Sequence, residues 1–421
     1  MTRLVAAPAR DAPVGTRVVL DVRPLQEPER TPITAEYLAN LLDAFTAEPL
    51  PGESFVVVSR ALRPDPTLAL QKRGLHVEAR RRLPPTSRVF RSAGLTLDSF
   101  LLRGAELGVE PAVAEEPAPA SGRGTIYHTA GGAVPLASHL PVVATLLDLA
   151  PWELPQTYAA SPAARFGHRL RRRVLHDAAR VIVCSRANAD SARRRLHLPA
   201  DRLAVVPLAV GAAFRAAGAD EALRADIRAR FGLPERYLVF AGRYDARKDL
   251  GTLFAALRED GEQAAPLPIV LAGMYDEGSD ETALRRAAER SGAADRLLVT
   301  PPLAEAERAA LVGAATGFLY PALAEATGAR VLEALALGVP VICSRAGALP
   351  EIVGGAGIIV EPRDPRRLAS AIAALTAGGS LAQQLQRAAR RHGESDHRTW
   401  RDVARETRAV YAAAAQTGSP G

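Results

Sequence analysis

Residues Gly317 to Pro340 read GFLYPALAEATGARVLEALALGVP, and this stretch decides the fold. Its pattern predicts a buried strand over Gly317–Tyr320, then a loop, then a short helix over Gly328–Leu337. From Val331 to Cys343 the single charged side chain is Glu333. A helix that is apolar all round is normally buried, and an apolar strand before it is typical of a parallel sheet covered by helices.

Two carboxylates frame the start of this helix. Glu325 lies in the loop, eight residues before Glu333. Eight helical residues rise about 12 Å, so the two side chains could lie along one side, roughly a nucleotide sugar's length apart. Gly328 lies between them, where the N–H groups of a helix start can face an anion. The alternative is that Glu333 lies on a narrow solvated edge and Glu325 is a surface loop residue; the spacing alone does not decide.

The chain continues from Ala334 to Ile372 as ALALGVPVICSRAGALPEIVGGAGIIVEPRDPRRLASAI. With Glu325-x7-Glu333, this resembles the donor-binding signature of the retaining GT-B glycosyltransferases of family 4, the glycosyl transferases group 1. The resemblance extends more weakly across most of the chain. It implies an α/β fold of two Rossmann-like doubly wound domains that face each other across a cleft, with an NDP-sugar on the second and the acceptor on the first.

The family usually has Glu-Gly-Phe-Gly-Leu-Pro in the loop. Here the loop reads Glu325, Ala326, Thr327, Gly328, Ala329, Arg330. The resemblance implies that Glu325 holds the donor sugar and that Glu333 binds its ribose. We therefore expect the donor to contact a set of loop and helix residues: Glu325, Thr327, Gly328, Ala329 and Glu333.

A cationic segment follows the first predicted strand of the second domain, Tyr237–Ala241. It contains Gly242, Arg243 and Lys248, and ligands of open α/β sheets bind beyond the carboxyl ends of strands. Arginine grips oxygens in a fork and lysine supplies a compact charge, which suits a diphosphate. The segment resembles the family's Gly-Arg…Arg-Lys, which implies that Arg243 and Lys248 act in catalysis with Glu325. The alternative is a solvated loop.

No Asp-x-Asp motif appears in a metal-binding context. GT-B enzymes generally balance the charge of the leaving group with side chains and helix dipoles. We therefore expect no cofactor and no essential metal. A dinucleotide oxidoreductase is excluded because Gly-x-Gly-x-x-Gly follows neither domain's first strand.

The N-terminal half departs from the family. After a predicted strand at Arg17–Val22, the loop lacks the usual glycines. The segment VVATLLDLAPWELP resembles the family's Thr-Val-His-Asp-Leu and keeps the aspartate as Asp148, but Leu147 stands where the family has the histidine beside the reacting sugar. His128 and Asp148 are the acceptor-side candidates, although a lone histidine is more often structural.

Alternating strands and helices predict two parallel-sheet domains. We expect an N-terminal acceptor-side domain over 1–207 and a nucleotide-sugar domain over 208–394. The resemblance implies that a C-terminal helix, 395–415, crosses back onto the first domain. Residues 416–421 are expected to be a disordered tail, and the Pro/Ala/Gly-rich residues 110–124 an exposed loop.

The net charge of +7 is carried almost wholly by arginine, since the lysines are Lys72 and Lys248. With so much alanine, this is a compositional bias rather than a sign of nucleic-acid binding. The basic helix predicted over 164–179 is either a solvated face or a contact with a membrane surface. No signal peptide or membrane span is evident, which predicts a cytoplasmic protein, peripheral on the inner face of the membrane if this helix binds lipid.

The sequence thus predicts a retaining hexosyltransferase. It would move a hexose-type sugar from an NDP-sugar to a glycan or lipid-linked acceptor in cell-envelope polysaccharide or glycolipid synthesis. The alternative is a catalytically degenerate GT-B protein that binds a nucleotide sugar or acts as a scaffold for another glycosyltransferase. Leu147 and the missing glycines favour the scaffold, and the intact donor half favours the enzyme.

Overall fold

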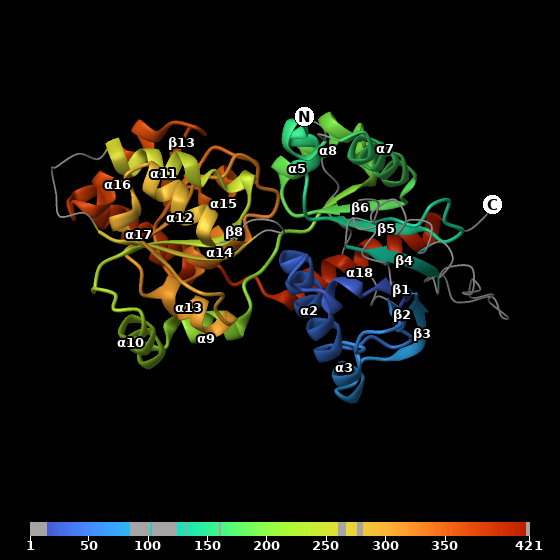
Figure 1. Cartoon of the computed structure of the whole chain (residues 1–421). Coiled ribbons are helices and arrows are strands. Elements are labelled where there is room, and N and C mark those ends of the chain that lie inside the picture. Colours follow the sequence, from blue (N-terminus) through green and yellow to red (C-terminus); the bar gives the residue numbers. More distant parts are fainter. Residues whose placement is uncertain are drawn as a thin grey trace. The chain divides into compact units, whose positions relative to one another are not determined.

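The computed structural model describes residues 15–84, 102, 124–130, 133–159, 161–259, 267–275 and 281–417. The chain forms two compact units, which Figure 1 shows. One comprises Met1–Leu208 with Trp400–Gly421, and the other Ala209–Thr399. Of the loop predicted over 110–124, all but Gly124 lies outside the described residues, as do residues 418–421 of the predicted tail.

The first unit is built on a parallel sheet with strand order β3-β2-β1-β4-β5-β6-β7 among its described residues. Strands β1, β2, β4 and β5 are buried along nearly their whole length, and β1, β2 and β5 carry apolar runs, as expected for a sheet covered on both faces. The strand bounds are β1 Arg17–Asp21, β2 Ser54–Arg60, β3 Val77–Leu83, β4 Thr125–Thr129, β5 Val142–Leu146, β6 Arg180–Val183 and β7 Leu203–Val205.

Helices connect these strands, and a C-terminal helix belongs to the same unit. The helix bounds are α1 Arg23–Gln26, α2 Pro32–Ala47, α3 Leu68–Lys72, α5 Ala150–Glu153, α6 Pro155–Tyr158, α7 Pro162–Asp177, α8 Arg186–Leu196 and, for the C-terminal helix, α18 Trp400–Thr417. A 3-10 turn lies at Ala200–Arg202. The basic helix therefore starts and ends two residues earlier than predicted. Gln416 and Thr417, predicted in the tail, are helical.

Helix α18 is anchored to the first unit by a buried ion pair. Arg408 donates to both carboxylate oxygens of Glu53, at 2.8 and 2.7 Å. Both side chains are buried, and the guanidinium also lies 4.7 Å from the centroid of the Phe45 ring. This pair satisfies two charges that would otherwise be costly in the interior.

The second unit is a parallel sheet with strand order β10-β9-β8-β11-β12-β13. Numbered within the unit, this is the order 3-2-1-4-5-6 of a doubly wound fold, and the order reverses between β8 and β11. The strand bounds are β8 Leu238–Tyr244, β9 Ile269–Tyr275, β10 Leu297–Val299, β11 Gly317–Tyr320, β12 Val341–Ser344 and β13 Gly357–Val360.

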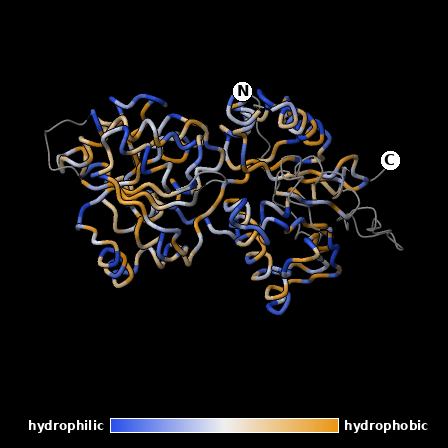
Figure 2. Tube along the Cα trace, in the orientation of Figure 1, coloured by the Kyte–Doolittle hydropathy of each residue, from blue (hydrophilic) through white to orange (hydrophobic). Residues whose placement is uncertain are grey.

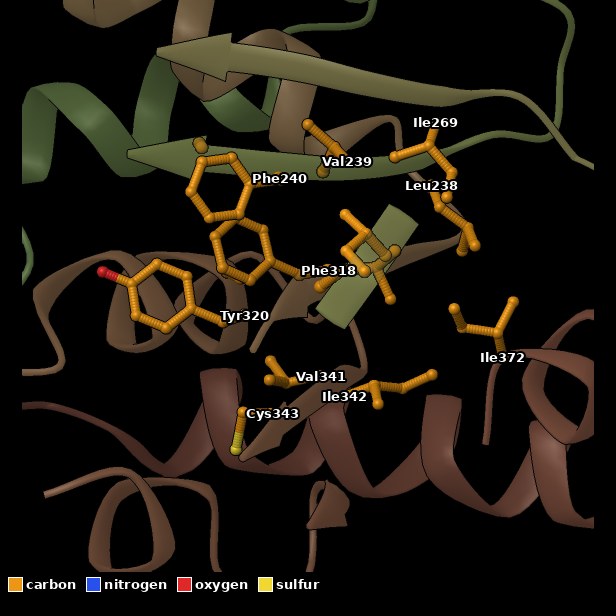
Figure 3. Close-up of a cluster of buried hydrophobic side chains, with 14 of the residues drawn as sticks. Leu238, Val239, Phe240, Ile269, Phe318, Tyr320, Val341, Ile342, Cys343 and Ile372 are labelled. Carbon is orange, nitrogen blue, oxygen red and sulfur yellow. The ribbon is translucent and has the colours of Figure 1, made fainter. Parts of the chain in front are cut away.

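Helices flank this sheet, and their apolar faces close the core. Their bounds are α9 Ala212–Ala219, α10 Glu221–Arg230, α11 Leu250–Glu259, α12 Glu281–Arg290, α13 Glu305–Gly313, α14 Ala329–Ala336, α15 Leu349–Val353, α16 Pro365–Thr376 and α17 Ser380–Ser395, with 3-10 turns at Ala246–Lys248 and Ala294–Arg296. Hydrophobic residues follow the strands in Figure 2. Phe240, Phe318 and Tyr320 lie in a row of stacked rings in Figure 3.

The doubly wound architecture predicted from the sequence is confirmed in both units. Of the helices in the described ranges, none combines the length and the apolar character needed to cross a bilayer.

Candidate functional site

The switch point of the second sheet brings two predicted site segments together. Strand β8 leads into Lys248, and its neighbour β11 leads into Glu325. Connections leave in opposite directions on the two sides of such a point, and ligands of α/β folds bind there, outside the carboxyl ends of the strands.

Strand β8 is longer than predicted and ends at Tyr244 rather than at Ala241. Gly242 and Arg243 are therefore strand residues paired with β9, and the prediction that they follow the strand is wrong. The approach is close, because a Cβ built on Gly273 would lie 1.9 Å from the carbonyl oxygen of Gly242. Arg243 is half-buried at the penultimate position of the strand.

Lys248 and Glu325 form a buried ion pair. The lysine Nζ donates to Glu325 Oε2 at 2.5 Å, and the residues are 6% and 9% exposed. The two segments are also joined through the backbone, since the N–H of Leu323 donates to the carbonyl of Arg247 at 2.6 Å. A pair this buried is charged and held in one geometry.

Tyr320, the last residue of β11, completes a three-residue cluster. Lys248 Nζ donates to the tyrosine Oη at 2.6 Å, and the hydroxyl donates to Glu325 Oε2 at 2.9 Å. The lysine nitrogen also lies 4.6 Å from the centroid of the tyrosine ring, within cation–π range.

The pair keeps both residues ionised. Burial by itself would raise the pKa of Glu325, but the charge and hydrogen bond of Lys248 outweigh it and lower this pKa to about 2. Burial would lower the pKa of Lys248, yet the carboxylate of Glu325 raises it above its ordinary value. The site therefore presents a permanent ammonium group at neutral pH.

The second oxygen of Glu325 binds the start of helix α14. Oε1 accepts from the N–H of Gly328 at 3.0 Å and from the N–H and hydroxyl of Thr327 at 3.3 and 3.2 Å. The N–H of Ala329 is directed at the Thr327 hydroxyl, at 3.5 Å. The backbone donors predicted to face a donor phosphate bind protein oxygens in this structure, with Glu325 serving as their anion.

Gly347 fixes the backbone of Glu325 from the other side. It has φ +49°, and a Cβ built on it would lie 1.9 Å from the Glu325 carbonyl oxygen. The same carbonyl accepts from the N–H of Ala348 at 2.9 Å. A residue with a side chain at 347 would displace the loop that carries the carboxylate.

Glu333 is 6% exposed and is held by two arginines. Its oxygens accept from Arg308 of α13 and from Arg330 of α14. The prediction of a buried α14 carboxylate that needs a partner is met by these two side chains.

His128 lies in the interior of the first unit and is fully buried. Its Nε2 is 2.9 Å from the Thr145 hydroxyl and its Nδ1 is 2.7 Å from the Tyr411 hydroxyl, which ties β4, β5 and α18 together. Burial lowers its pKa to about 3, so the ring is neutral at physiological pH. These contacts favour the structural interpretation of His128 over an acceptor-side role.

Asp148 lies just beyond the carboxyl end of β5 and is half-buried. Its Oδ1 accepts from the N–H of Ala150 at 2.8 Å, which starts helix α5. The neighbouring Leu147 is 8% exposed and belongs to the apolar interior.

The basic helix α7 presents one solvent-exposed face. Its exposed residues are mostly basic: Arg165, Arg169, Arg172, Arg173 and His176 are exposed together with Phe166, Pro162 and Ala163, and with the acidic Asp177 at the last position. Phe166 is 60% exposed, an unusual position for a large apolar side chain.

Within the described ranges, no three His, Cys, Asp or Glu side chains gather as ligands for a metal ion.

Two family models match the chain. Residues 224–392 match glycosyl transferases group 1, and residues 123–213 match Glycosyltransferase Family 4. The chain belongs to glycosyltransferase family 4. Lys248, Tyr320, Glu325 and Glu333 of this family 4 chain all lie within the first matched segment.

A curated relative of this family 4 chain is D-inositol 3-phosphate glycosyltransferase of Streptomyces avermitilis. The two are 32% identical over 266 residues, which are 61% of this chain and 56% of the relative. The chain spans about half the length of the curated relatives it matches.

Solved structures share the fold. Sucrose-phosphate synthase from Thermosynechococcus elongatus superposes with a TM-score of 0.68 at 20% identity, over 93% of this chain and 97% of that one. Anabaena HepE in complex with UDP-glucose superposes with a TM-score of 0.65 at 16% identity, over 94% and 98%. The predicted GT-B fold is confirmed by these similarities and by the two parallel sheets.

Sequence reasoning missed Tyr320, Gly347 and the arginine partners of Glu333. Tyr320 ends an apolar strand, so its sequence position indicated a core residue rather than a site residue. Gly347 is one of many glycines, and nothing in the sequence distinguished it from the others. Arg330 carried a signal, because it is the charged residue in a loop where the family usually has proline.

Proposed function

We propose that this family 4 chain is a retaining glycosyltransferase that moves a hexose-type sugar from an NDP-sugar to a glycan or lipid-linked acceptor in cell-envelope polysaccharide or glycolipid synthesis. The observation that carries the proposal is the buried Lys248–Tyr320–Glu325 cluster at the switch point of the second sheet. A buried ammonium group is suited to bind a phosphate oxygen, and the same fold holds UDP-glucose in HepE.

In the proposed reaction, Lys248 and Arg243 bind the diphosphate and stabilise the charge that it gains as the sugar–phosphate bond breaks. Two of the three Lys248 N–H donors are used by Tyr320 and Glu325 within the described part of the chain, which leaves one for a phosphate oxygen. The acceptor hydroxyl attacks the face that the phosphate leaves, and its proton passes to the departing phosphate.

Glu325 has two roles in this proposal. It keeps Lys248 charged and in place, and it lies at the start of α14, where the sugar is expected. Glu333, held by Arg308 and Arg330, is proposed to accept the ribose hydroxyls. Thr327, Gly328 and Ala329 would contact the donor from the same loop, with their N–H groups exchanging the bonds to Glu325 and Thr327 for bonds to the donor.

A thermal-shift panel of UDP-, GDP-, ADP- and dTDP-sugars tests the donor half. A ligand bound by the native state alone raises the melting temperature, so one nucleotide class should stand out. Transfer is then measured with that donor and an acceptor set that includes lipid-linked glycans and inositol 3-phosphate. No shift with any of these sugars would refute the proposed donor binding.

The second candidate is the scaffold protein, which Leu147 favours. This apolar, 8% exposed side chain stands where the family has its histidine, and His128 is committed to the core. A chain that binds one NDP-sugar yet neither hydrolyses nor transfers it would support the scaffold. Activity gained in Leu147→His would then trace the loss to that position.

We also propose that α7 docks this unit on an anionic membrane surface, where a lipid-linked acceptor would be found. Its exposed arginines suit acidic headgroups, and Phe166 supplies an apolar side chain that can enter the interface. Sedimentation with phosphatidylcholine vesicles, with and without phosphatidylglycerol, tests this. Binding should require the anionic lipid and fail in Arg165→Gln/Arg169→Gln/Arg172→Gln. The matched control is Arg387→Gln/Arg390→Gln/Arg391→Gln, which removes the same charge from exposed positions of α17.

A further inference from the structure

Tyr320 carries a polar group at the end of an apolar row. Its ring stacks on Phe240 and Phe318, with centroids 5.8 Å away in each case, and the residue is 2% exposed. Figure 3 shows its hydroxyl oxygen directed away from these rings. A phenylalanine would fill the same space, so packing does not explain the hydroxyl.

The hydroxyl joins the two charges of the site. The ammonium of Lys248 can only donate and the ionised carboxylate of Glu325 can only accept. The bond directions therefore run from Lys248 to Tyr320 Oη and from Tyr320 Oη to Glu325 Oε2, at 2.6 and 2.9 Å. One hydroxyl thus fixes both charged groups, from the last position of β11 at the switch point.

A lysine needs such fixing more than most side chains. Its four-carbon stem loses much rotamer freedom when the ammonium group is held at one place. The bonds to Tyr320 and Glu325 restrict the rotamers of Lys248 before a ligand binds, so this entropy is not lost again on binding. A group preorganised in this way binds its ligand more tightly. The cation–π contact, at 4.6 Å from the ring centroid, adds to the same restraint but does not depend on the hydroxyl.

We propose that the hydroxyl of Tyr320 is a positioning group that holds Lys248 where the β-phosphate of a nucleoside diphosphate binds. This inference rests on the proposed function, because it assigns to Tyr320 the orientation of the phosphate-binding lysine. Tyr320 itself contacts the lysine and the carboxylate.

Tyr320→Phe tests the inference because it keeps the ring and removes the hydroxyl. The matched control is Tyr237→Phe, at the position directly before β8; this tyrosine is also buried, and its hydroxyl donates to the carbonyl of Leu311 at 2.6 Å. Titration calorimetry compares the diphosphates UDP, GDP, ADP and dTDP with the corresponding monophosphates, and inorganic pyrophosphate probes the phosphate site alone. Urea unfolding reports the stability of each variant, and Lys248→Ala is measured alongside.

Tyr320→Phe should weaken diphosphate and pyrophosphate binding roughly threefold to tenfold, the range of one lost hydrogen bond, and leave the monophosphates nearly unchanged. Tyr237→Phe should lose stability without losing affinity. Equal losses for mono- and diphosphates, or the same losses in Tyr237→Phe, would assign Tyr320 a purely structural role and overturn the inference.

The outcome for Lys248→Ala separates the two proposals. If this variant loses diphosphate affinity while Tyr320→Phe keeps it, the positioning role is refuted and the proposed function stands. If the wild-type chain binds none of these diphosphates and no pyrophosphate, the proposed function fails and the inference fails with it.

Discussion

Lys248 and Glu325 are 77 positions apart in sequence, yet their side chains meet at 2.5 Å in the interior of the second unit. They follow neighbouring strands on the two sides of the switch point. Each charge is compensated by the other, so a change at either residue alters both ligand binding and folding stability.

Lys248→Ala should weaken binding of the preferred nucleoside diphosphate by about 2 kcal/mol, the scale of a lost charge-assisted hydrogen bond. It should also lower the free energy of unfolding by roughly 3 kcal/mol, because Glu325 is left buried without its counter-ion. Titration calorimetry and urea unfolding measure the two effects. Lys72→Ala, which changes an exposed lysine of α3, is the control and should change neither.

The double variant Lys248→Met/Glu325→Gln separates the two effects of that change. With both charges gone, much of the lost stability should return, since no unpaired charge remains in the interior. Diphosphate affinity should stay low because the phosphate-binding ammonium is absent. Recovery of affinity in this variant would show that Lys248 does not bind the phosphate.

Several features of the site were within reach of the sequence and others were not. Lys248, Glu325 and Glu333 could be predicted as site residues from their charges and their places in the sequence. The hydrogen-bond partners of buried polar residues could not be predicted in this way. Tyr320 and its partner Lys248 are 72 positions apart in sequence, and Tyr411 and its partner His128 are 283 apart. The order of the strands in the sheet determines which residues distant in sequence come into contact. The periodicity of the sequence indicates only which residues are buried.

The extension of β8 was missed for a local reason. Gly242 is a poor strand former, and the predicted strand therefore ended at Ala241. They pair with β9 because Gly242 and Gly273 let two backbones approach without side chains between them. Tertiary pairing overrode local preference at this place.

Gly347→Ala should disturb the Glu325 loop. A Cβ there would meet the Glu325 carbonyl oxygen, and φ is +49°, which disfavours a side chain. We expect a loss of about 1–3 kcal/mol in unfolding free energy, together with weaker donor binding. Gly355→Ala is the matched control, because a Cβ at that glycine meets no atom within 4 Å. Equal stability of the two variants would contradict the account of this loop.

Acid should destabilise the two units in different pH ranges. The pKa of His128 falls from 6.5 to about 3 on folding, so the unfolded chain takes up this proton first. Its contribution to stability is present above pH 6.5 and is lost as pH falls towards about 3. For Glu325, the pKa falls from 4.5 to about 2, so its contribution is present above pH 4.5 and is lost towards about pH 2.

Variants in which the titrating side chain is replaced by glutamine reveal the pH range over which each residue contributes to stability. The difference in unfolding free energy between wild type and His128→Gln should shrink as pH falls from 6.5 to about 3. The difference between wild type and Glu325→Gln should shrink between 4.5 and about 2. Urea unfolding at a series of pH values, with far-UV circular dichroism as the probe, gives both curves; a constant difference for either variant would contradict its predicted shift.

Transfer should not require a divalent metal, because Lys248 and Arg243 are expected to neutralise the leaving diphosphate. Once a donor and acceptor are known, turnover in EDTA should equal turnover in Mg²⁺ or Mn²⁺ within about twofold, since no charge compensation would be lost. Complete loss in EDTA that either ion restores would refute this, provided that EDTA leaves the melting temperature unchanged.

Glu325 and Glu333 should have different effects on kinetics, and this separates the enzyme from the scaffold. Glu325 holds the phosphate-binding lysine and lies where the sugar is expected, so its contacts matter most as the sugar–phosphate bond breaks. Groups felt mainly in the transition state govern kcat, and groups that bind substrate and transition state alike govern KM. Glu325→Gln should therefore lower kcat by roughly tenfold or more, with a smaller effect on nucleotide affinity.

Glu333→Gln should chiefly raise KM for the donor and weaken binding of the bare nucleotide, since the ribose does not change during the reaction. Its two arginine partners would lose their counter-ion, so donor affinity is compared at a temperature where unfolding measurements show both variants folded. Glu361→Gln, at an exposed ion pair with Arg345, is the control and should change neither constant. A wild-type chain with no turnover has no kcat to lose, so a measured kcat that falls in Glu325→Gln and not in Glu333→Gln would exclude the scaffold.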